Sequence, residues 1–271
     1  MAFDQFVSWN PGGFGSVSKA VQNKKLSIIK NYLLHPEKLN MLCLVETHLF
    51  EKNKLPKYLI DFEHTYHICH TFASATDTHA GITVFINKKY QLLHEEILME
   101  GRLLYVQVKN ISDTTQNFFF YYGPHSNLAE REQHIDIAQN YINNNTLEEI
   151  FFLGDFNYVT SNLDTNQGSI NYQTLAQSWI VFEQNNSIFD TFRYRCPKRR
   201  LYSNTGTNKK SKTRIDRIYV PSTIIDQIKS TLFHETEKIG HKVVEVQVFK
   251  GVENGPGSWA FKNALLQDGA I

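Results

Sequence analysis

Polar side chains occur repeatedly in this sequence where apolar, strand-like runs begin or end. They are Asn10 after Phe6–Trp9, Glu46 after Met41–Val45, Tyr122 before Gly123 and Pro124, Asp155 and Asn157 at the end of Phe151–Gly154, Asp216 within Thr213–Val220, and His241 before Val243–Phe249. Strand ends are where rigid sheets usually present active-site groups. Each residue alone has an ordinary explanation as a turn former or a surface residue. The prediction of an active site therefore depends on the whole set.

The oxygen-bearing members of the set suit a hydrolase that uses a divalent metal ion. Glu46 and Asn10 offer the hard oxygen ligands that favour Mg²⁺, with Mn²⁺ as a possible substitute. Asp155 can orient or deprotonate an attacking water molecule, and Asn157 can donate a hydrogen bond to a non-bridging phosphate oxygen.

The remaining charged pair completes a set for cleaving a phosphodiester. His241, held by Asp216, can protonate the phosphate or stabilise the charge that develops on it. Every group needed for metal-assisted in-line displacement then has a candidate. The sequence offers no Ser or Cys nucleophile elbow and no Gly-rich nucleotide loop, so other transfer chemistries lack their usual residues.

The cysteines indicate a reducing compartment. Cys43, Cys69 and Cys196 are odd in number and widely separated, without a CxxC spacing. This argues against disulfides and against a structural zinc site. The sequence also contains no apolar run that approaches the length of a membrane span, so we expect no membrane partner.

One segment of this nearly neutral chain is strongly basic. The net charge is +1, yet ten cations and only one acid, Asp216, lie between Arg193 and Arg217. A solvated surface is the ordinary explanation of such a run, whereas a phosphate-contacting surface explains its concentration in one place. The predicted DNA contacts are Arg200, Lys209, Lys210, Lys212, Arg214 and Arg217.

Strand-like runs outnumber helical ones, which favours an α+β layered sandwich over a strict βαβ repeat. The predicted strands are Phe3–Trp9, Met41–Glu46, Thr65–Phe72, Ile82–Asn87, Leu103–Lys109, Asn117–Tyr122, Ile150–Gly154, Arg214–Val220 and Val243–Phe249. The predicted helices are Lys19–Leu34, Ala129–Asn143 and Tyr172–Gln184. Ser203–Ser211 predicts the tip of a hairpin. We expect one catalytic domain over residues 1–250 and a short helix-like tail over 251–271.

The ordered motifs resemble those of the endonuclease/exonuclease/phosphatase superfamily. They are Asn10, Val45-Glu46-Thr47-His48, Tyr122-Gly123-Pro124, Gly154-Asp155-Phe156-Asn157, Arg214-Ile215-Asp216-Arg217-Ile218 and Gly240-His241, and they cover nearly the whole chain. The resemblance implies a four-layered α/β/β/α sandwich like that of pancreatic deoxyribonuclease (DNase I), with the site at one edge of two packed sheets. It also implies a catalytic role for Tyr122.

Further details resemble the endonucleases of LINE-type, non-LTR retrotransposons. They are Ala80–Ile82, Arg214–Val220 and the tail Gly257–Leu266, which is similar to the segment that leads towards reverse transcriptase in such elements. This resemblance implies a nuclear enzyme that nicks double-stranded DNA. The freed 3′-hydroxyl would prime a reverse transcriptase domain of the same polyprotein. The hairpin Tyr202–Thr213 falls where relatives carry a loop that probes the DNA groove.

The sequence departs from the family pattern near the predicted metal. Gly240 replaces the Asp that usually precedes the catalytic His, Gly12 stands where relatives often have Asp or Asn, and Arg200 lies where a phosphate-contacting Thr is usual. We expect Gly240→Asp to raise nicking. Two alternatives stay open: an abasic-site nuclease or other phosphodiesterase on the same fold, and a catalytically impaired DNA-binding module.

Overall fold

The computed structural model describes residues 3–14, 18–51, 57–125, 128–167, 173–206, 210–236 and 240–249. The predicted DNA contact Lys209 and the predicted tail, residues 251–271, lie outside the described residues. The division between the catalytic domain and this tail therefore stays a prediction.

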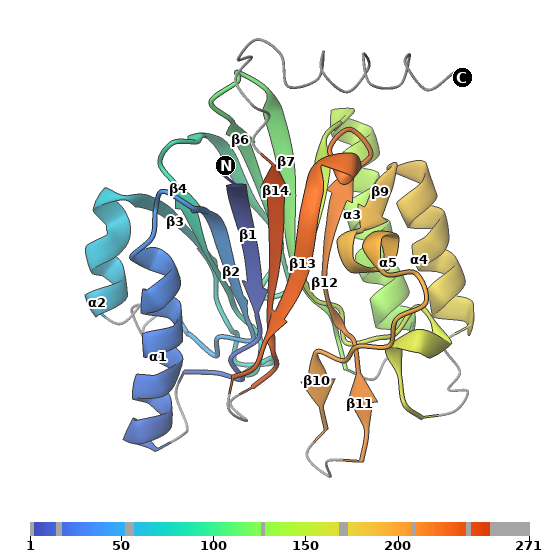
Figure 1. Ribbon diagram of the computed structural model, residues 1–271, viewed down its shortest axis with the longest axis horizontal. Coiled ribbons are helices and arrows are strands. Elements are labelled where there is room, and N and C mark those ends of the chain that lie inside the picture. The colour runs from blue at the N-terminus through green and yellow to red at the C-terminus, as the bar shows by residue number, and fades with distance from the viewer. Residues whose placement is uncertain are drawn as a thin grey trace, which may run out of the picture.

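Two six-stranded sheets form the centre of the molecule (Figure 1). The first sheet has the order β13-β14-β1-β2-β4-β3, formed by β1 (Phe3–Trp9), β2 (Leu39–Val45), β3 (Tyr66–Thr71), β4 (Ile82–Asn87), β13 (Ile228–His234) and β14 (Val243–Phe249). The second has the order β5-β6-β7-β8-β12-β9, formed by β5 (Gln91–Met99), β6 (Leu103–Lys109), β7 (Thr115–Tyr122), β8 (Ile150–Asp155), β9 (Ile188–Asp190) and β12 (Asp216–Pro221). Both sheets are mixed, because β1 and β2 run parallel in one and β7 and β8 run parallel in the other.

The two sheets pack face to face because their central strands are apolar on both sides. Every residue of β2 and of β8 is buried. Alternate residues of both sheets form one shared core that includes Phe6, Val45, Phe118, Phe151 and Val246. The opposite faces form two outer cores, which the helices complete.

Helices cover the outer faces of both sheets (Figure 1). On the first sheet, α1 (Lys19–Leu33) buries Ile29 and Leu33 in the outer core. On the second, α3 (Leu128–Asn145) and α4 (Gln173–Asn185) bury Ile135, Trp179 and other apolar residues. The architecture is the predicted four-layered α/β/β/α sandwich, and the α+β prediction is confirmed.

Short elements connect these layers. They are α2 (Lys57–Ile60), α5 (Thr191–Arg195), and the 3₁₀ helices η1 (Asp61–His64), η2 (Asn162–Asp164) and η3 (Ile225–Gln227). The predicted hairpin is present as the antiparallel pair β10 (Asn204–Thr205) and β11 (Lys212–Thr213). Among the described helices, none has the length and apolar character needed to cross a membrane.

All of the predicted strands and helices are present, with ends that differ by a few residues. The sequence prediction missed β5, β9 and β13, which lie at the edges of their sheets. Most of β5 is solvent exposed, including the charged stretch His94–Glu96. An edge strand of this kind lacks the regular apolar pattern from which a strand is predicted.

Candidate active site

Three adjacent strands of the second sheet place their site residues next to one another in register. Tyr122 at the end of β7 is the register partner of Asp155 at the end of β8. Asp155 is in turn the register partner of Asp216, which begins the antiparallel strand β12. Backbone pairing alone therefore places these three predicted residues side by side.

The first sheet contributes the other site residues at the same edge of the sandwich. Asn10 follows β1 and Glu46 follows the parallel neighbour β2, so both leave the sheet on the same side. His241 precedes β14, which is antiparallel to β1. The backbone N–H of His241 donates to the carbonyl oxygen of Asn10 at 3.1 Å, which fixes the start of β14 beside the end of β1.

The side-chain amide of Asn10 joins the two sheets. Its Nδ2 donates to Glu46 Oε2 at 2.7 Å and to Asp155 Oδ2 at 2.8 Å. Its Oδ1 accepts the backbone N–H of Gly12 at 2.8 Å. Both polar atoms of this buried amide are engaged, so Asn10 orients the carboxylate of Glu46; its Oδ1 keeps a second lone pair, and its role as a metal ligand stays a prediction.

His241 is held between two buried carboxylates. Its Nδ1 lies 3.0 and 2.9 Å from the two carboxylate oxygens of Asp216, and 3.4 Å from Asp155 Oδ2. Burial alone would lower the pKa of His241, but Asp216 and then Asp155 oppose it and raise the pKa to about 9. The imidazole is therefore a cation at neutral pH, with Nδ1 committed to Asp216 as predicted.

Asp155 is the most enclosed member of the site. Its side chain is fully buried. Burial and the neighbouring charge of Asp216 raise its pKa, although His241 and the hydrogen bond from Asn10 act in the opposite direction. A carboxylate whose pKa is raised towards neutrality is a better proton acceptor than an ordinary aspartate.

Asn157 lies beside Asp155 in a left-handed backbone conformation, with φ of 55°. Its backbone N–H donates to Asp155 Oδ1 at 2.9 Å. Its Nδ2 donates to the carbonyl oxygen of Gly123 at 2.7 Å, which uses one of the two amide hydrogens. The side chain therefore belongs to the site, and its predicted contact with phosphate requires the second amide hydrogen.

Tyr122 contacts the predicted metal carboxylate. Its hydroxyl donates to Glu46, and its oxygen lies 2.9 Å from His125 Nε2. The guanidinium of Arg102 lies over the Tyr122 ring, 4.4 Å from its centroid. Burial and the nearby charge of Glu46 raise the pKa of the phenol, so Tyr122 is a hydrogen-bond donor and not a base.

Glu46 has the properties expected of a metal ligand. Burial raises its pKa, but hydrogen bonds from His48, Asn10 and Tyr122 outweigh this effect and lower the pKa to about 2. Its side chain is 17% exposed, so an ionised hard oxygen faces solvent at the mouth of the site. These features fit a divalent cation that keeps part of its water shell.

A second group of side chains also has the geometry to hold a metal. Ligand atoms of Asp155, Asp216 and His241 all lie within 4.8 Å of one another. However, both carboxylates are buried and already engaged by His241 and Asn10. An ion there would have to displace the imidazolium, whereas Glu46 can bind one without breaking that pair.

Two site residues were not predicted from the sequence. The buried Lys25 on α1 donates from Nζ to the carbonyl oxygens of Gly12 and Gly13, at 3.0 and 2.7 Å, and so fixes the loop after β1. His125 contacts the Tyr122 hydroxyl. The sequence holds no signal for Lys25, because its partners are backbone atoms, whereas His125 stands next to the recognised Tyr122-Gly123-Pro124 motif.

The predicted DNA contacts divide into two groups. Arg200, Lys210 and Lys212 are exposed, on the hairpin or on the segment that precedes it. Arg214 and Arg217 are each only 1% exposed, so the prediction that they contact DNA is wrong. Both guanidinium groups bind acceptors inside the protein instead of facing solvent.

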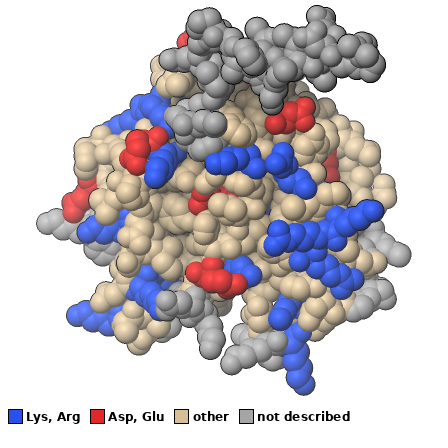
Figure 2. Space-filling view, viewed as in Figure 1, with Lys and Arg blue, Asp and Glu red and all other residues tan. Residues whose placement is uncertain are grey.

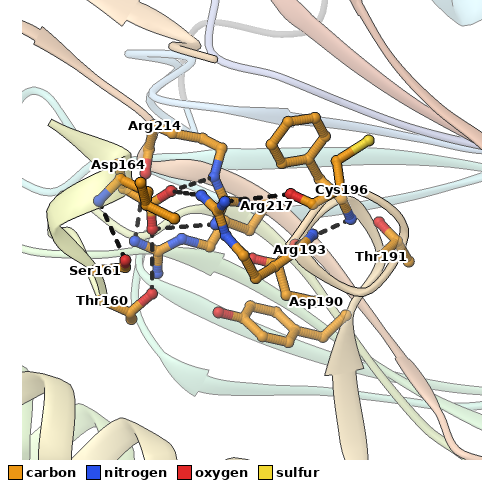
Figure 3. A network of polar contacts seen from close by, with 12 residues as sticks. Thr160, Ser161, Asp164, Asp190, Thr191, Arg193, Cys196, Arg214 and Arg217 are labelled. Carbon is orange, nitrogen blue, oxygen red and sulfur yellow. Dashed lines mark hydrogen bonds and ion pairs between the residues drawn. The ribbon is translucent and has the colours of Figure 1, made fainter. Parts of the chain in front are cut away.

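The buried arginines belong to an internal polar network (Figure 3). Arg214 Nε donates to Asp164 Oδ1 at 2.7 Å, and its Nη2 lies 2.7 Å from Asp190 Oδ2. Arg217 donates to the carbonyl oxygen of Tyr158, and its guanidinium lies 5.2 and 5.3 Å from the ring centroids of Phe156 and Tyr158. These contacts fix the start of β12, from which Asp216 projects.

Comparisons with known proteins agree with this geometry. A model of the Endonuclease/Exonuclease/phosphatase family matches residues 8–229. The "Transposon TX1 uncharacterized 149 kDa protein" of Xenopus laevis is 24% identical over 205 residues, which cover 73% of this chain. The chain spans only 15% of the length of that relative.

Solved structures with low sequence identity share the fold. The AP endonuclease LMAP of Leishmania major has a TM-score of 0.71 at 13% identity, with 91% of this chain and 88% of that chain covered. The 3′-5′ exonuclease NExo of Neisseria meningitidis has a TM-score of 0.68 at 16% identity, with 90% and 99% covered.

Gly240 cannot be replaced by Asp without strain, so we expect Gly240→Asp to lose stability, and its expected gain in nicking stays a prediction. Its φ is +63°, and a Cβ atom would lie 2.5 Å from the carbonyl oxygen of Asn10. We expect Gly240→Asp to cost about 1–2 kcal/mol for the left-handed backbone and roughly 1–3 kcal/mol more for overpacking. Thermal and urea denaturation measure this loss.

Gly12→Asp is the matched control. Gly12 has the same φ, but nothing lies within 4 Å of its added Cβ. It should therefore show the backbone cost without the packing cost. Equal stability of the two variants would contradict the close contact with Asn10.

Asp164 should carry much of the stability of the internal network. Asp164→Asn removes the charge that faces Arg193 and Arg214 inside the protein. We expect the free energy of unfolding to fall by roughly 3–5 kcal/mol, because the buried Arg214 loses one of its two carboxylate partners and Arg193 loses Asp164 as well. Urea denaturation measures it. Asp113→Asn, which breaks an exposed ion pair with Lys109, should change stability little; an equally small effect at Asp164 would rule out the proposed contribution.

Proposed function

Since the chain belongs to the endonuclease/exonuclease/phosphatase family, we propose that it is a divalent-metal-dependent endodeoxyribonuclease of a non-LTR retrotransposon. Mg²⁺ is the proposed ion and Mn²⁺ its substitute. The enzyme nicks one strand of double-stranded DNA, and the freed 3′-hydroxyl primes reverse transcription. The match to a transposon protein of which this chain spans 15% supports a place within a longer polyprotein. A reverse transcriptase domain of that polyprotein, acting in the nucleus, is part of the proposal.

One observation carries the catalytic proposal. The Asn10 amide bonds Glu46 and Asp155 together, while His241 lies between Asp155 and Asp216. An ionised metal ligand, a proton acceptor and an imidazolium are thereby assembled around one position. Metal-assisted hydrolysis of a phosphodiester needs these three groups.

The residues have distinct proposed roles. Glu46 holds the cation, which when bound polarises the phosphate and neutralises charge on it. Asp155 accepts a proton from the attacking water, whose oxygen bonds to phosphorus as the bond to O3′ breaks. The leaving O3′ takes a proton from solvent and becomes the 3′-hydroxyl. His241 donates from Nε2 to a non-bridging oxygen while Asp216 holds Nδ1. Asn157 donates its second amide hydrogen to the phosphate, and Tyr122 orients Glu46.

The proposed DNA contacts outside this centre are Arg200, Lys210 and Lys212. All three are exposed; Lys212 begins β11, which leads to the start of β12, and Lys210 lies two residues before it. Lys209, which lies outside the described residues, is kept as a predicted contact.

Nicking of supercoiled plasmid tests the proposed activity. We expect open circles to form with Mg²⁺ or Mn²⁺ and not with EDTA. Glu46→Gln should reduce the rate by at least about 100-fold, because a neutral amide binds a hard cation poorly. Glu51→Gln, an exposed residue of the same charge, serves as control.

Two outcomes would replace this proposal by an alternative. Strong preference for a duplex with an abasic site over an intact duplex would indicate an abasic-site nuclease, the activity named for one of the structures with this fold. Retained DNA binding with plasmid that stays closed would indicate an impaired binding module.

The pH dependence of nicking should report the Asp216–His241 pair. Since the pKa of His241 is raised to about 9, the proton on its ring is present below that pH and lost above it. The pair therefore stabilises the fold fully below the unfolded-state pKa of about 6.5 and ceases to do so as pH rises through 9. We expect nicking to decline over the same upper range.

Asp216→Asn should move this decline to lower pH, because it removes the largest interaction that raises the pKa. NMR titration of His241 and the pH–rate profile measure the shift. Glu37→Gln, which alters the exposed pair with His35, should leave the profile unchanged. An Asp216→Asn profile that coincides with the wild type would show that His241 does not act as the proposed donor.

A further inference from the structure

A segment between α5 and β10 carries three consecutive exposed cations, Lys198, Arg199 and Arg200. We call residues 196–203 the basic loop. Figure 2 shows Lys and Arg side chains gathered over the part of the molecule where α5 and the chain after it lie in Figure 1. No acidic residue occurs between Arg193 and Ile215 in the sequence, so nothing within this segment neutralises the charge.

Arg193 holds the first half of the basic loop. Its Nη1 donates to the carbonyl oxygens of Cys196, Pro197 and Arg199, at 3.3, 3.2 and 3.0 Å. Its Nη2 donates to the buried carboxylate of Asp164, which also binds Arg214 (Figure 3). Because the carbonyl groups converge on one guanidinium, the exposed cations project from a loop whose backbone is already ordered.

Ser203 holds the other end of the loop and is 1% exposed. Its backbone N–H donates to Thr213 O at 2.9 Å, and its carbonyl oxygen accepts the N–H of Lys242, the neighbour of His241, at 2.8 Å. Its hydroxyl oxygen accepts the N–H groups of Ile215 and Asp216, both at 3.1 Å. One serine thus connects the basic loop to the backbone of Asp216 and to that of Lys242, which follows His241.

We propose that the basic loop is a preformed contact surface for the DNA backbone flanking the nicked phosphodiester. Ser203 is the positioning residue that fixes this surface relative to Asp216 and His241. The proposal rests on the proposed function and extends it to Lys198 and Arg199. Exposed Arg and Lys side chains on an ordered backbone bind phosphate without the cost of ordering a loop. Duplex DNA is the occupant because the loop is joined directly to the site that cleaves it.

The salt dependence of DNA binding tests the contact surface. The combined variant Lys198→Gln, Arg199→Gln and Arg200→Gln should bind a short duplex more weakly in fluorescence anisotropy without metal. If all three cations contact phosphate, the slope of log Kd against log salt should fall by about 2–3. This readout needs no catalysis, so it is distinguishable from failure of the proposed nicking activity.

A matched variant controls for net charge. Lys19→Gln, Lys30→Gln and Lys38→Gln remove three exposed cations from α1 and the turn after it, on the far side of the molecule in Figure 1. This variant should keep the wild-type slope. Equal slopes for the two variants would overturn the contact surface, and so would a loop-dependent preference for folded RNA over duplex DNA.

Ser203→Ala tests the connection to the active site. It leaves the cations in place but removes the hydroxyl that holds the Asp216 backbone, so we expect kcat to fall by about tenfold while the salt slope of binding stays unchanged. The titration of His241 in NMR should shift as well. Ser203→Thr, which keeps a hydroxyl, should recover part of kcat. A fall in thermal stability with unchanged kcat and His241 titration would overturn the positioning role.

Discussion

The site depends on one hydrogen-bonding group, the side-chain amide of Asn10. Its two N–H donors reach a carboxylate from each sheet, Glu46 at 2.7 Å and Asp155 at 2.8 Å. Two carboxylates brought this close without a donor between them would repel each other in a poorly hydrated interior. The amide lowers that cost without adding charge, so Glu46 remains ionised, as a metal ligand must be. Asn10 is itself fixed by two backbone donors. The N–H of Gly12 donates to its side-chain Oδ1, and the N–H of His241 donates to its backbone carbonyl oxygen.

The charge of the site is balanced in a second way on the opposite side of Asp155. There His241 carries the compensating proton between Asp155 and Asp216. The result is a polarised centre, with an acidic group facing solvent at Glu46 and an imidazolium at the other end. Such a preformed arrangement lowers the reorganisation that a reaction would otherwise require.

Buried ion pairs away from the reacting groups give this centre a rigid base. Asp164 binds Arg193 and Arg214, so a single carboxylate connects the basic loop with the strand that bears Asp216. Buried pairs of this kind contribute little net stability compared with an apolar core, although breaking them is costly. Their presence here is explained better by the position they impose on β12 and the loop than by stability.

The sequence predicted the parts of this arrangement that follow from strand patterning. Strands apolar on both faces, such as β2 and β8, predicted two covered sheets, and their ends predicted Glu46 and Asp155. The sequence did not distinguish exposed cations from Arg214 and Arg217, because Asp164, which pairs with Arg214, and Tyr158, which packs against Arg217, are distant from them in sequence. Ser203 and Lys25 were missed because they act on backbone atoms, which leave no motif. The strain at Gly240 likewise depends on a φ angle and on the approach of Asn10.

The position of the bound cation tests the central assignment most directly. Anomalous diffraction from crystals grown with Mn²⁺ would locate it independently of activity. The account predicts a peak at the carboxylate of Glu46, with the contact between His241 Nδ1 and Asp216 preserved. A peak enclosed by Asp155, Asp216 and His241, with the imidazole turned to ligate the ion, would contradict it.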